Sequence, residues 1–343
     1  MTPSQTLSAI LSAHQFNTTS GAPRNRYVNL HIEGSPGVAK SSVVYQAAKQ
    51  LDLPVIEFRF AGSDATDLKG IPDLKSGRTV WATPEELPID PDWEGFIFFD
   101  EIVQGGAMVM SSVTELVLEG RMGMYNLPRK AVIVSAGNRR SDRAAVNDMP
   151  RHLADRFCVI PMEADPDDFC SWAATSDIRP EVISFIRAMG GNLSKFDPAQ
   201  LKSPTPRGWS FVSSVLDMKG IDPFVQQTLI AGYVGEGAAV VFSGHLRLFG
   251  QIPTVEEILA SPKTARVPDP SSEHGPAMCW AVATNLSLAL NGKNAKGVVE
   301  YVDRFHSEEF GVLAIRDALF RDKTLRGVAE IKAWAARHSS LII

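Results

Sequence analysis

A short segment in the first fifth of the chain combines glycines, a lysine and a serine in the spacing of a phosphate-binding loop. The segment reads Gly34-Ser35-Pro36-Gly37-Val38-Ala39-Lys40-Ser41. It follows an apolar run and leads into a helical pattern, so backbone N–H groups of the loop and of the first helical turn, including Ser42, would face phosphate oxygens. The Lys40 ammonium would reach the outer phosphates, and the Ser41 hydroxyl would ligate magnesium. This spacing predicts a nucleoside triphosphate site.

One position departs from the usual pattern of such loops. Ala39 stands where G-x-x-x-x-G-K-[ST] has its last glycine. A methyl group fits there if the residue has helical dihedrals, but it narrows the room around the phosphates. The departure puts the turnover rate in question more than nucleotide binding. The alternative is a Gly/Pro turn that caps a helix and leaves Lys40 in solvent.

A second segment is an apolar run that ends in two adjacent carboxylates. It reads Gly95-Phe96-Ile97-Phe98-Phe99-Asp100-Glu101. Apolar residues without alternation are typical of a strand buried on both faces. Burying unpaired charge costs free energy, so two carboxylates at the end of a buried strand indicate a functional role. The two residues would have different roles: Asp100 would hold magnesium through water, and Glu101 would polarise the attacking water. The alternative is a strand that runs into an exposed acidic turn.

The elements that must position these residues alternate between strand and helix. Five segments predict strands: 27–32, 55–60, 96–99, 131–136 and 157–162. Helical patterns lie between them, for example the apolar residues from Met108 to Val117 that line one face. Such alternation favours a parallel sheet covered on both sides, with its ligand beyond the carboxyl ends of the strands. The loop and the carboxylate pair both fall at such ends.

Three further polar positions follow along the chain. Asn138 comes directly after the fourth predicted strand, where its amide could hydrogen-bond a phosphate or the attacking water. Arg151 and Arg156 lie on a short helical segment, and a planar guanidinium there could stabilise charge on phosphoryl oxygens. Arg207 lies in the first turn of a helix that follows a Pro-rich stretch. Each of these signals is weak on its own, and for a single arginine near a helix end the alternative is a solvated or carboxylate-paired side chain.

The order of these parts resembles the AAA+ ATPases, and within them the MoxR branch, including the versions found beside von Willebrand A-type partners. Two more stretches are similar to features of that branch. Residues 67–70 followed by 77–81 resemble its insertion into the second helix. Residues 115–121, running through Leu127 and Pro128, resemble the hairpin before the strand that leads to Asn138. The resemblance covers residues 27 to about 215.

This resemblance implies roles for the residues and a working assembly. It implies hydrolysis of ATP with Mg²⁺, with Glu101 as the base that activates water, Asn138 as sensor 1 and Arg207 as sensor 2. It implies that Arg156, with Arg151 as a competitor, serves the site of a neighbouring subunit. The working unit would then be a homo-oligomer, expected as a hexameric ring. Its expected partner is a client or von Willebrand A-type protein that is remodelled or activated.

The chain is expected to divide into four parts. Strand signals end near residue 163, and a Pro- and Ser-rich stretch interrupts the helical patterns after residue 261. The expected parts are an N-terminal helical segment (1–26), an α/β nucleotide-binding domain of AAA+ type (27–163), an all-α lid (164–261), and a linker with a helical C-terminal extension (262–343).

Composition sets limits on the class of protein. With 343 residues, 44% hydrophobic and 21% charged, the chain is typical of a soluble globular protein. A net charge of −5 gives no electrostatic footprint for nucleic acid. No apolar run approaches the ~20 residues of a membrane helix, and from the residues at the start of the chain we expect no export signal. Three widely spaced cysteines fit reduced thiols, so we expect a cytoplasmic location without membrane contact.

Two other function classes stay open at this point. One is a DNA-directed AAA+ motor of the restriction or replication type, which the acidic balance disfavours. The other is a scaffold that binds nucleotide but turns it over slowly. The alanine at position 39, in place of the usual glycine, is the reason for considering it.

Overall fold

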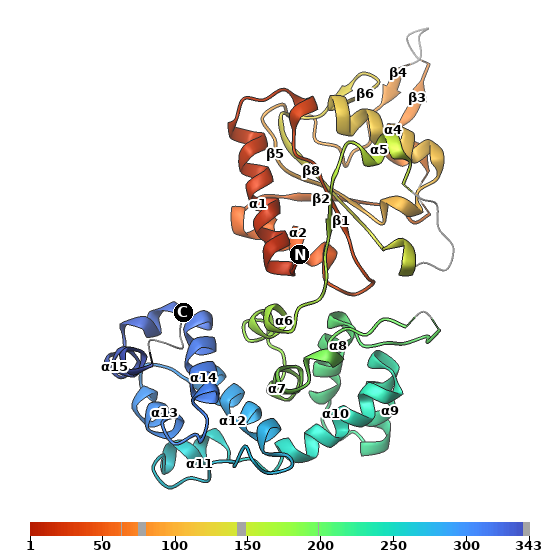
Figure 1. Ribbon diagram of the computed structural model, residues 1–343. Helices are drawn as coiled ribbons and strands as arrows, with labels where there is room; N and C mark the ends of the chain where they lie inside the picture. Colours follow the sequence, from red (N-terminus) through yellow and green to blue (C-terminus); the bar gives the residue numbers. More distant parts are fainter. Residues whose placement is uncertain (63, 75–79, 143–148, 198, 339–343) are drawn as a thin grey trace. The chain divides into compact units, whose positions relative to one another are not determined.

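The computed structural model describes the chain apart from residues 63, 75–79, 143–148, 198 and 339–343 (Figure 1). The chain forms two compact units, Met1–Ala164 and Asp165–Ile343. The first unit contains the central sheet, and the described part of the second is helical. The predicted fold class, an α/β region followed by an all-α region, is confirmed. The finer four-part division stays a prediction.

The first unit is built on a five-stranded parallel sheet (Figure 1). Its strands are β1 (Leu30–Glu33), β2 (Val55–Arg59), β5 (Glu94–Asp100), β8 (Lys130–Gly137) and β9 (Cys158–Pro161). Their order across the sheet is β2-β5-β8-β1-β9, and every neighbouring pair is parallel. All five strands predicted from the sequence are therefore present. Because β8 lies between β1 and β5, whatever follows β8 lies between the phosphate loop and the carboxylate pair.

Both faces of the sheet are covered, as the unbroken apolar strands require. In β5, Phe96 and Phe98 pack into the core shared with α1 and α2, whereas Ile97 and Phe99 pack into the core shared with α4. Successive side chains of a strand point to opposite faces, so this strand contributes two fully buried residues to each core. The helices of the unit are α1 (Pro3–Thr19), α2 (Lys40–Leu51), α3 (Ala65–Lys69), α4 (Ala107–Glu119) and α5 (Arg151–Ala154).

Two short antiparallel hairpins interrupt the α/β alternation. The first joins β3 (Ile71–Asp73) to β4 (Val80–Ala82) and follows α3. It falls where the sequence resembles an insertion, although residues 77–79 of that resemblance lie outside the described residues. The second joins β6 (Arg121–Met122) to β7 (Tyr125–Asn126) directly before β8, as the resemblance predicted.

The second unit is helical throughout its described part. Its α-helices are α6 (Pro166–Ala173), α7 (Pro180–Ala188), α8 (Pro206–Leu216), α9 (Pro223–Val234), α10 (Glu236–Phe249), α11 (Val255–Ala260), α12 (Gly275–Ala289), α13 (Ala295–Val302), α14 (Glu308–Arg321) and α15 (Ala329–Arg337). Short 3₁₀ helices occur in both units: η1 (Arg24–Arg26), η2 (Ile102–Gln104), η3 (Arg140–Asp142), η4 (Gly190–Asn192) and η5 (Lys323–Gly327).

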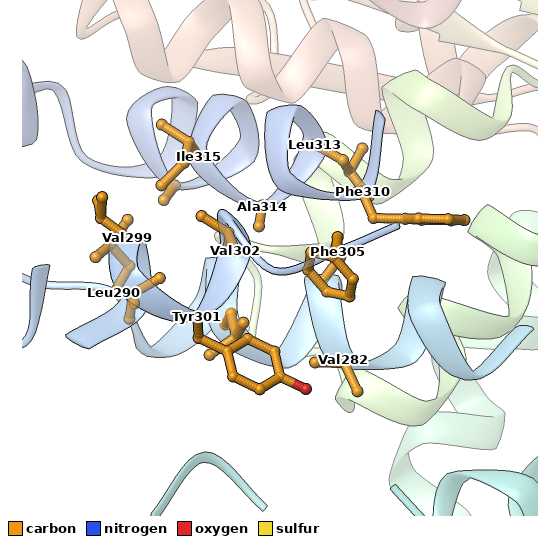
Figure 2. Close-up of a cluster of buried hydrophobic side chains, with 14 of the residues drawn as sticks. Val282, Leu290, Val299, Tyr301, Val302, Phe305, Phe310, Leu313, Ala314 and Ile315 are labelled. Carbon is orange, nitrogen blue, oxygen red and sulfur yellow. The ribbon is translucent and has the colours of Figure 1, made fainter. Parts of the chain in front are cut away.

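An apolar core joins the helices on either side of residue 262. Figure 2 shows part of it, where Val282 of α12, Tyr301 of α13 and Phe310 of α14 gather with aliphatic neighbours. Ile258 of α11 belongs to the same cluster, and α12 also packs against α7. The C-terminal helices are therefore anchored on the helices that precede them. Among the described residues, no helix is both long and apolar enough to span a membrane.

Candidate nucleotide-binding site

The predicted loop lysine lies at the centre of a hydrogen-bonded cluster at the carboxyl edge of the sheet. Its Nζ donates to the Asn138 Oδ1 at 2.8 Å, to the carbonyl oxygen of Gly34 at 2.8 Å and to that of Ser35 at 3.0 Å. Gly34 follows β1 and Asn138 follows β8, which are neighbouring strands. Residues 98 positions apart in sequence thus meet at one ammonium group because two parallel strands end side by side.

The predicted magnesium ligands also lie next to each other. The Ser41 hydroxyl donates to the Asp100 Oδ2 at 3.2 Å, and the other oxygen of Asp100 accepts the backbone N–H of Glu101 at 3.1 Å. A hydroxyl and a carboxylate are hard oxygen ligands of the kind that Mg²⁺ prefers. Among the described residues no cluster of three or more His, Cys, Asp or Glu could hold a metal. One carboxylate with one hydroxyl fits an ion that also takes waters and phosphate oxygens.

The loop backbone adopts conformations that few residues tolerate. Gly37 has φ 78° and Ala39 has φ 79°, both in the left-handed region. The condition under which the sequence analysis accommodated a methyl group here, right-handed helical dihedrals, is therefore not met. The residue keeps the backbone for which glycine is usually chosen, at a cost of roughly 1 kcal/mol. Gly34 is required for another reason, because a Cβ there would lie 2.6 Å from the carbonyl oxygen of Met162.

The amino end of α2 offers unsatisfied N–H donors to an anion. The helix begins at Lys40, directly after Ala39, and no side chain caps its first turn. The first N–H groups of a helix have no intrahelical partner, and the helix dipole favours negative charge beside them. Ser41 and Ser42 contribute two of these groups. The donors of the loop, the Lys40 ammonium and the oxygen pair beside it together fit a magnesium-bound nucleotide phosphate.

Glu101 is held in a strained backbone conformation next to this cluster. Its φ is 53°, which is uncommon for a residue other than glycine. Its side chain is half-buried, and within the described part of the chain its carboxylate accepts no hydrogen bond. Backbone strain of this kind costs about 1–3 kcal/mol and concentrates at functional sites. The carboxylate is thus available for a ligand or a water molecule.

A buried polar pair joins β8 to β1 near the carboxyl end of β8. His31 of β1 and Ser135 of β8 are hydrogen-bonded at 2.8 Å, and both are buried. The His31 ring also fills the space beside Gly137, where a Cβ would lie 3.1 Å from its Cε1 atom. A Cβ at Gly137 would require the His31 ring to shift by a few tenths of an ångström, so β8 ends close against β1. This packing sets the course of the chain into Asn138.

Arg151 and Arg156, the predicted arginines of the first unit, lie away from the cluster. Arg156 follows α5 and precedes the amino end of β9, at the opposite edge of the sheet from Lys40. Its guanidinium donates to the His152 carbonyl, while its buried Nε has no partner among the described residues. Arg151 is exposed at the start of α5. Arg207 belongs to the second unit, where it is exposed on the first turn of α8.

One side chain at the site was missed by the sequence analysis. The Ser35 hydroxyl donates to Asp142 Oδ2 at 2.7 Å, which brings a further carboxylate onto the phosphate loop. Asp142 lies four residues after Asn138 and fits no motif. The only available signal was its position shortly after a strand whose carboxyl end was already expected at the site.

Comparisons with known proteins leave the family open. No family model matches the sequence, and neither does any curated protein. The solved structure of NtrX from Brucella abortus in complex with ADP is similar at 12% identity and a TM-score of 0.41, over 99% of this chain and 67% of that one. A mutant of RuvB from Thermotoga maritima is similar at 14% identity and a TM-score of 0.39, over 80% of this chain and 79% of that one. Because these scores are low, the function proposed below rests on the site residues and on the resemblance seen in the sequence, not on these structures.

Proposed function

We propose that this chain is an ATP hydrolase of the AAA+ class that uses Mg²⁺, and that it belongs to the MoxR branch. The observation that carries the proposal is the pair of contacts at the sheet edge, Lys40 with Asn138 and Ser41 with Asp100. Two residues from the loop meet two residues from the ends of different strands. A capped turn with a solvated lysine, the alternative raised by the sequence, would not bring these four side chains together.

The residues of the cluster have complementary tasks in this proposal. The Lys40 ammonium binds phosphate oxygens, and Ser41 with Asp100 would hold the metal, Asp100 through water. Bound Mg²⁺ supplies neutralisation of charge on the phosphates. Glu101, whose carboxylate has no competing hydrogen bond among the described residues, accepts a proton from the attacking water. Asn138 keeps the lysine in place and offers its amide to the same region.

Glu101→Gln tests this assignment most simply. The variant keeps the shape of the side chain but removes its basicity, so we expect phosphate release to fall ~10²–10⁴-fold while nucleotide binding persists. Glu85→Gln, an exposed change in the same unit, is the matched control and should keep the parent rate. Equal phosphate release from Glu101→Gln and the parent would exclude Glu101 as the base. Negligible release from the parent as well would favour the slow scaffold.

The position of Arg156 supports action on a neighbouring subunit. The residue precedes β9, whereas the loop follows the other end of the neighbouring strand β1. The four residues of β9 alone span roughly 13 Å at ~3.3 Å per residue, beyond the reach of an arginine side chain. In this proposal Arg156, with Arg151 as the alternative, completes the site of the next copy in a homo-oligomeric ring, expected to be a hexamer. Arg207 then acts as the second sensor from the helical lid.

A mixing experiment tests the shared site. Arg156→Ala and Lys40→Ala proteins should each be inactive alone. Mixed subunits would place an intact Lys40 next to an intact neighbouring Arg156, so part of the phosphate release should return. Continued inactivity of a mixture that assembles as the parent does would contradict the shared site.

The partner of the assembly is proposed from the resemblance alone. A client or von Willebrand A-type protein would be remodelled in the cytoplasm, and addition of such a protein encoded beside this chain should change its ATP turnover. Unchanged turnover on addition would count against that partner. The rival DNA-directed motor requires DNA affinity that falls steeply with salt. The net charge of −5 disfavours it, and a filter-binding titration at two salt concentrations separates the two classes.

A further inference from the structure

Two residues of the short segment that follows β8 hydrogen-bond to residues of the phosphate loop. At one end Asn138 binds the Lys40 ammonium, and at the other end Asp142 accepts the Ser35 hydroxyl. The segment is folded back on itself, because the Asp142 N–H donates to the Arg139 carbonyl at 3.1 Å. Ser35 in turn presents its carbonyl to Lys40. Asp142, Ser35, Lys40 and Asn138 thus form a continuous hydrogen-bonded chain across the mouth of the loop.

The negative charge of the Asp142 carboxylate is unexpected in a site that binds an anion. Every other feature of the loop favours negative charge on its ligand, from the amino end of α2 to the ammonium of Lys40. Asp142 instead brings negative charge onto the hydroxyl of Ser35, a residue of the loop itself. Its second oxygen accepts the Ser141 hydroxyl at 2.9 Å. Both hydroxyl donors are neutral, so neither cancels the charge of the carboxylate.

We propose that Asp142 lowers the affinity for the nucleotide and shortens the time for which it stays bound. It does so by holding the Ser35 hydroxyl in a hydrogen bond and by repelling the phosphates electrostatically. This inference rests on the proposed function. Two unit charges several ångströms apart near a protein surface interact by on the order of 1 kcal/mol or more. A site with this carboxylate therefore binds a nucleotide less tightly than the same site without it. Affinity changes within one site appear mainly in the dissociation rate, so Asp142 shortens the time for which product ADP stays bound.

The role differs from that of the carboxylate pair at the end of β5. Asp100 is placed against Ser41, where a cation is expected, and its charge favours the metal-bound ligand. Asp142 is placed against Ser35, at the start of the loop, and its charge opposes the ligand. Removing the charge should consequently have opposite effects at the two positions. The affinity for Mg-ADP should fall for Asp100→Asn and rise for Asp142→Asn.

Titration of the full-length protein with a fluorescent ADP analogue and Mg²⁺ tests the inference. We expect Asp142→Asn to bind about tenfold more tightly than the parent at low salt, with dissociation slowed by a similar factor in stopped-flow displacement. The gain should shrink to about twofold at high salt, because mobile ions screen the repulsion. Asp142→Glu, which keeps the charge, should stay within about twofold of the parent. Asp92→Asn, the same charge change on an exposed residue, should also leave the affinity unchanged.

The outcomes separate failure of the inference from failure of the proposed function. If the parent protein binds no nucleotide, the proposed function is wrong and the inference falls with it. If the parent binds and Asp142→Asn binds equally or more weakly, Asp142 supports the loop or the metal, and the inference is overturned. A gain that persists at high salt would overturn the electrostatic part of it. Asp142→Ala removes the same charge and replaces Asp142→Asn if that variant does not fold, as judged by its unfolding curve.

Discussion

The two units of the chain use polar side chains in different places. In the first unit Lys40, Asp100 and Asn138 are half-buried at the edge of a sheet, where strand ends bring them together. In the second unit the Arg187 side chain is only 4% exposed and pairs with Asp317, which is 14% exposed. His245 is likewise buried, against Ser184. Polar groups at an edge remain accessible to a ligand, whereas those inside a helical core only satisfy one another. Removing Lys40 or Asp100 should therefore cost binding, whereas removing one partner of the Arg187–Asp317 pair should cost stability.

The buried ion pair offers the largest expected effect on stability. Burial raises the pKa of Asp317, although the Arg187 charge opposes that shift, so desolvation outweighs attraction for this carboxyl. Asp317→Ala would leave the Arg187 guanidinium buried, with the exposed Asp167 as its one remaining ion-pair partner among the described residues. We expect the free energy of unfolding of the second unit to fall by about 3 kcal/mol. Chemical denaturation followed by tryptophan fluorescence measures this loss.

The matched control replaces both partners of the pair. Arg187→Met combined with Asp317→Leu removes the two buried charges together, so its stability should stay within about 1 kcal/mol of the parent. Nucleotide affinity should be unchanged in both variants, because neither Arg187 nor Asp317 belongs to the proposed site. A loss of nucleotide affinity with Asp317→Ala, or no loss of stability, would break the contrast between the units.

His245 gives a smaller effect, which depends on pH. Burial lowers the pKa of this histidine to about 4, from 6.5 for a free side chain. The folded state therefore binds the proton less tightly than the unfolded state. The corresponding stability is fully present above pH 6.5 and is lost as the pH falls towards 4. Between pH 7 and pH 5 we expect this residue to cost about 2 kcal/mol of stability. Denaturation curves at the two pH values measure it.

Two histidine variants isolate that contribution. His245→Gln removes the titrating group, so its stability should be lower at pH 7 but should change less between pH 7 and pH 5 than in the parent. The exposed His274 serves as the control, because His274→Gln should keep the pH dependence of the parent. An identical pH dependence in His245→Gln and the parent would show that His245 is not the titrating group.

Ala39 offers the smallest effect and concerns the first unit. Since its φ of 79° lies in the left-handed region, Ala39→Gly should relieve strain and raise stability by roughly 1 kcal/mol. Ala333→Gly, in the middle of α15 and exposed, should instead lower stability by roughly 1 kcal/mol. Thermal unfolding of the two variants measures both changes in stability. A destabilising Ala39→Gly would mean that the backbone at this position is not left-handed.

Much of the first unit could be predicted from the sequence because its signals are local. The apolar run from Phe96 to Phe99 predicts a strand buried on both faces, and the glycine–lysine–serine spacing predicts a loop between a strand and a helix. Both predictions are confirmed by β5 and by the loop between β1 and α2. The meeting of Lys40 with Asn138 followed from one rule, that parallel strands end at the same edge of their sheet.

Other features could not be predicted because their causes are not local. The left-handed backbone of Ala39 and Glu101 is imposed by the surrounding fold, whereas the residue types themselves favour right-handed or extended conformations. The contact of Ser35 with Asp142 joins residues 107 positions apart and depends on the path of the chain after β8. In the second unit, helical patterns predicted helices, but no spacing rule pairs Arg187 with a residue 130 positions away.

The central claim is that the Lys40 ammonium, held at the sheet edge by Asn138, binds the phosphates of a nucleotide. Isothermal titration of Lys40→Ala with Mg-ADP tests it directly, with denaturation curves to show that both units remain folded. Loss of a charge-assisted hydrogen bond in a partly buried site costs up to about 3 kcal/mol, so the affinity should fall about 100-fold. A Lys40→Ala protein that is folded and binds Mg-ADP as tightly as the parent would contradict the claim.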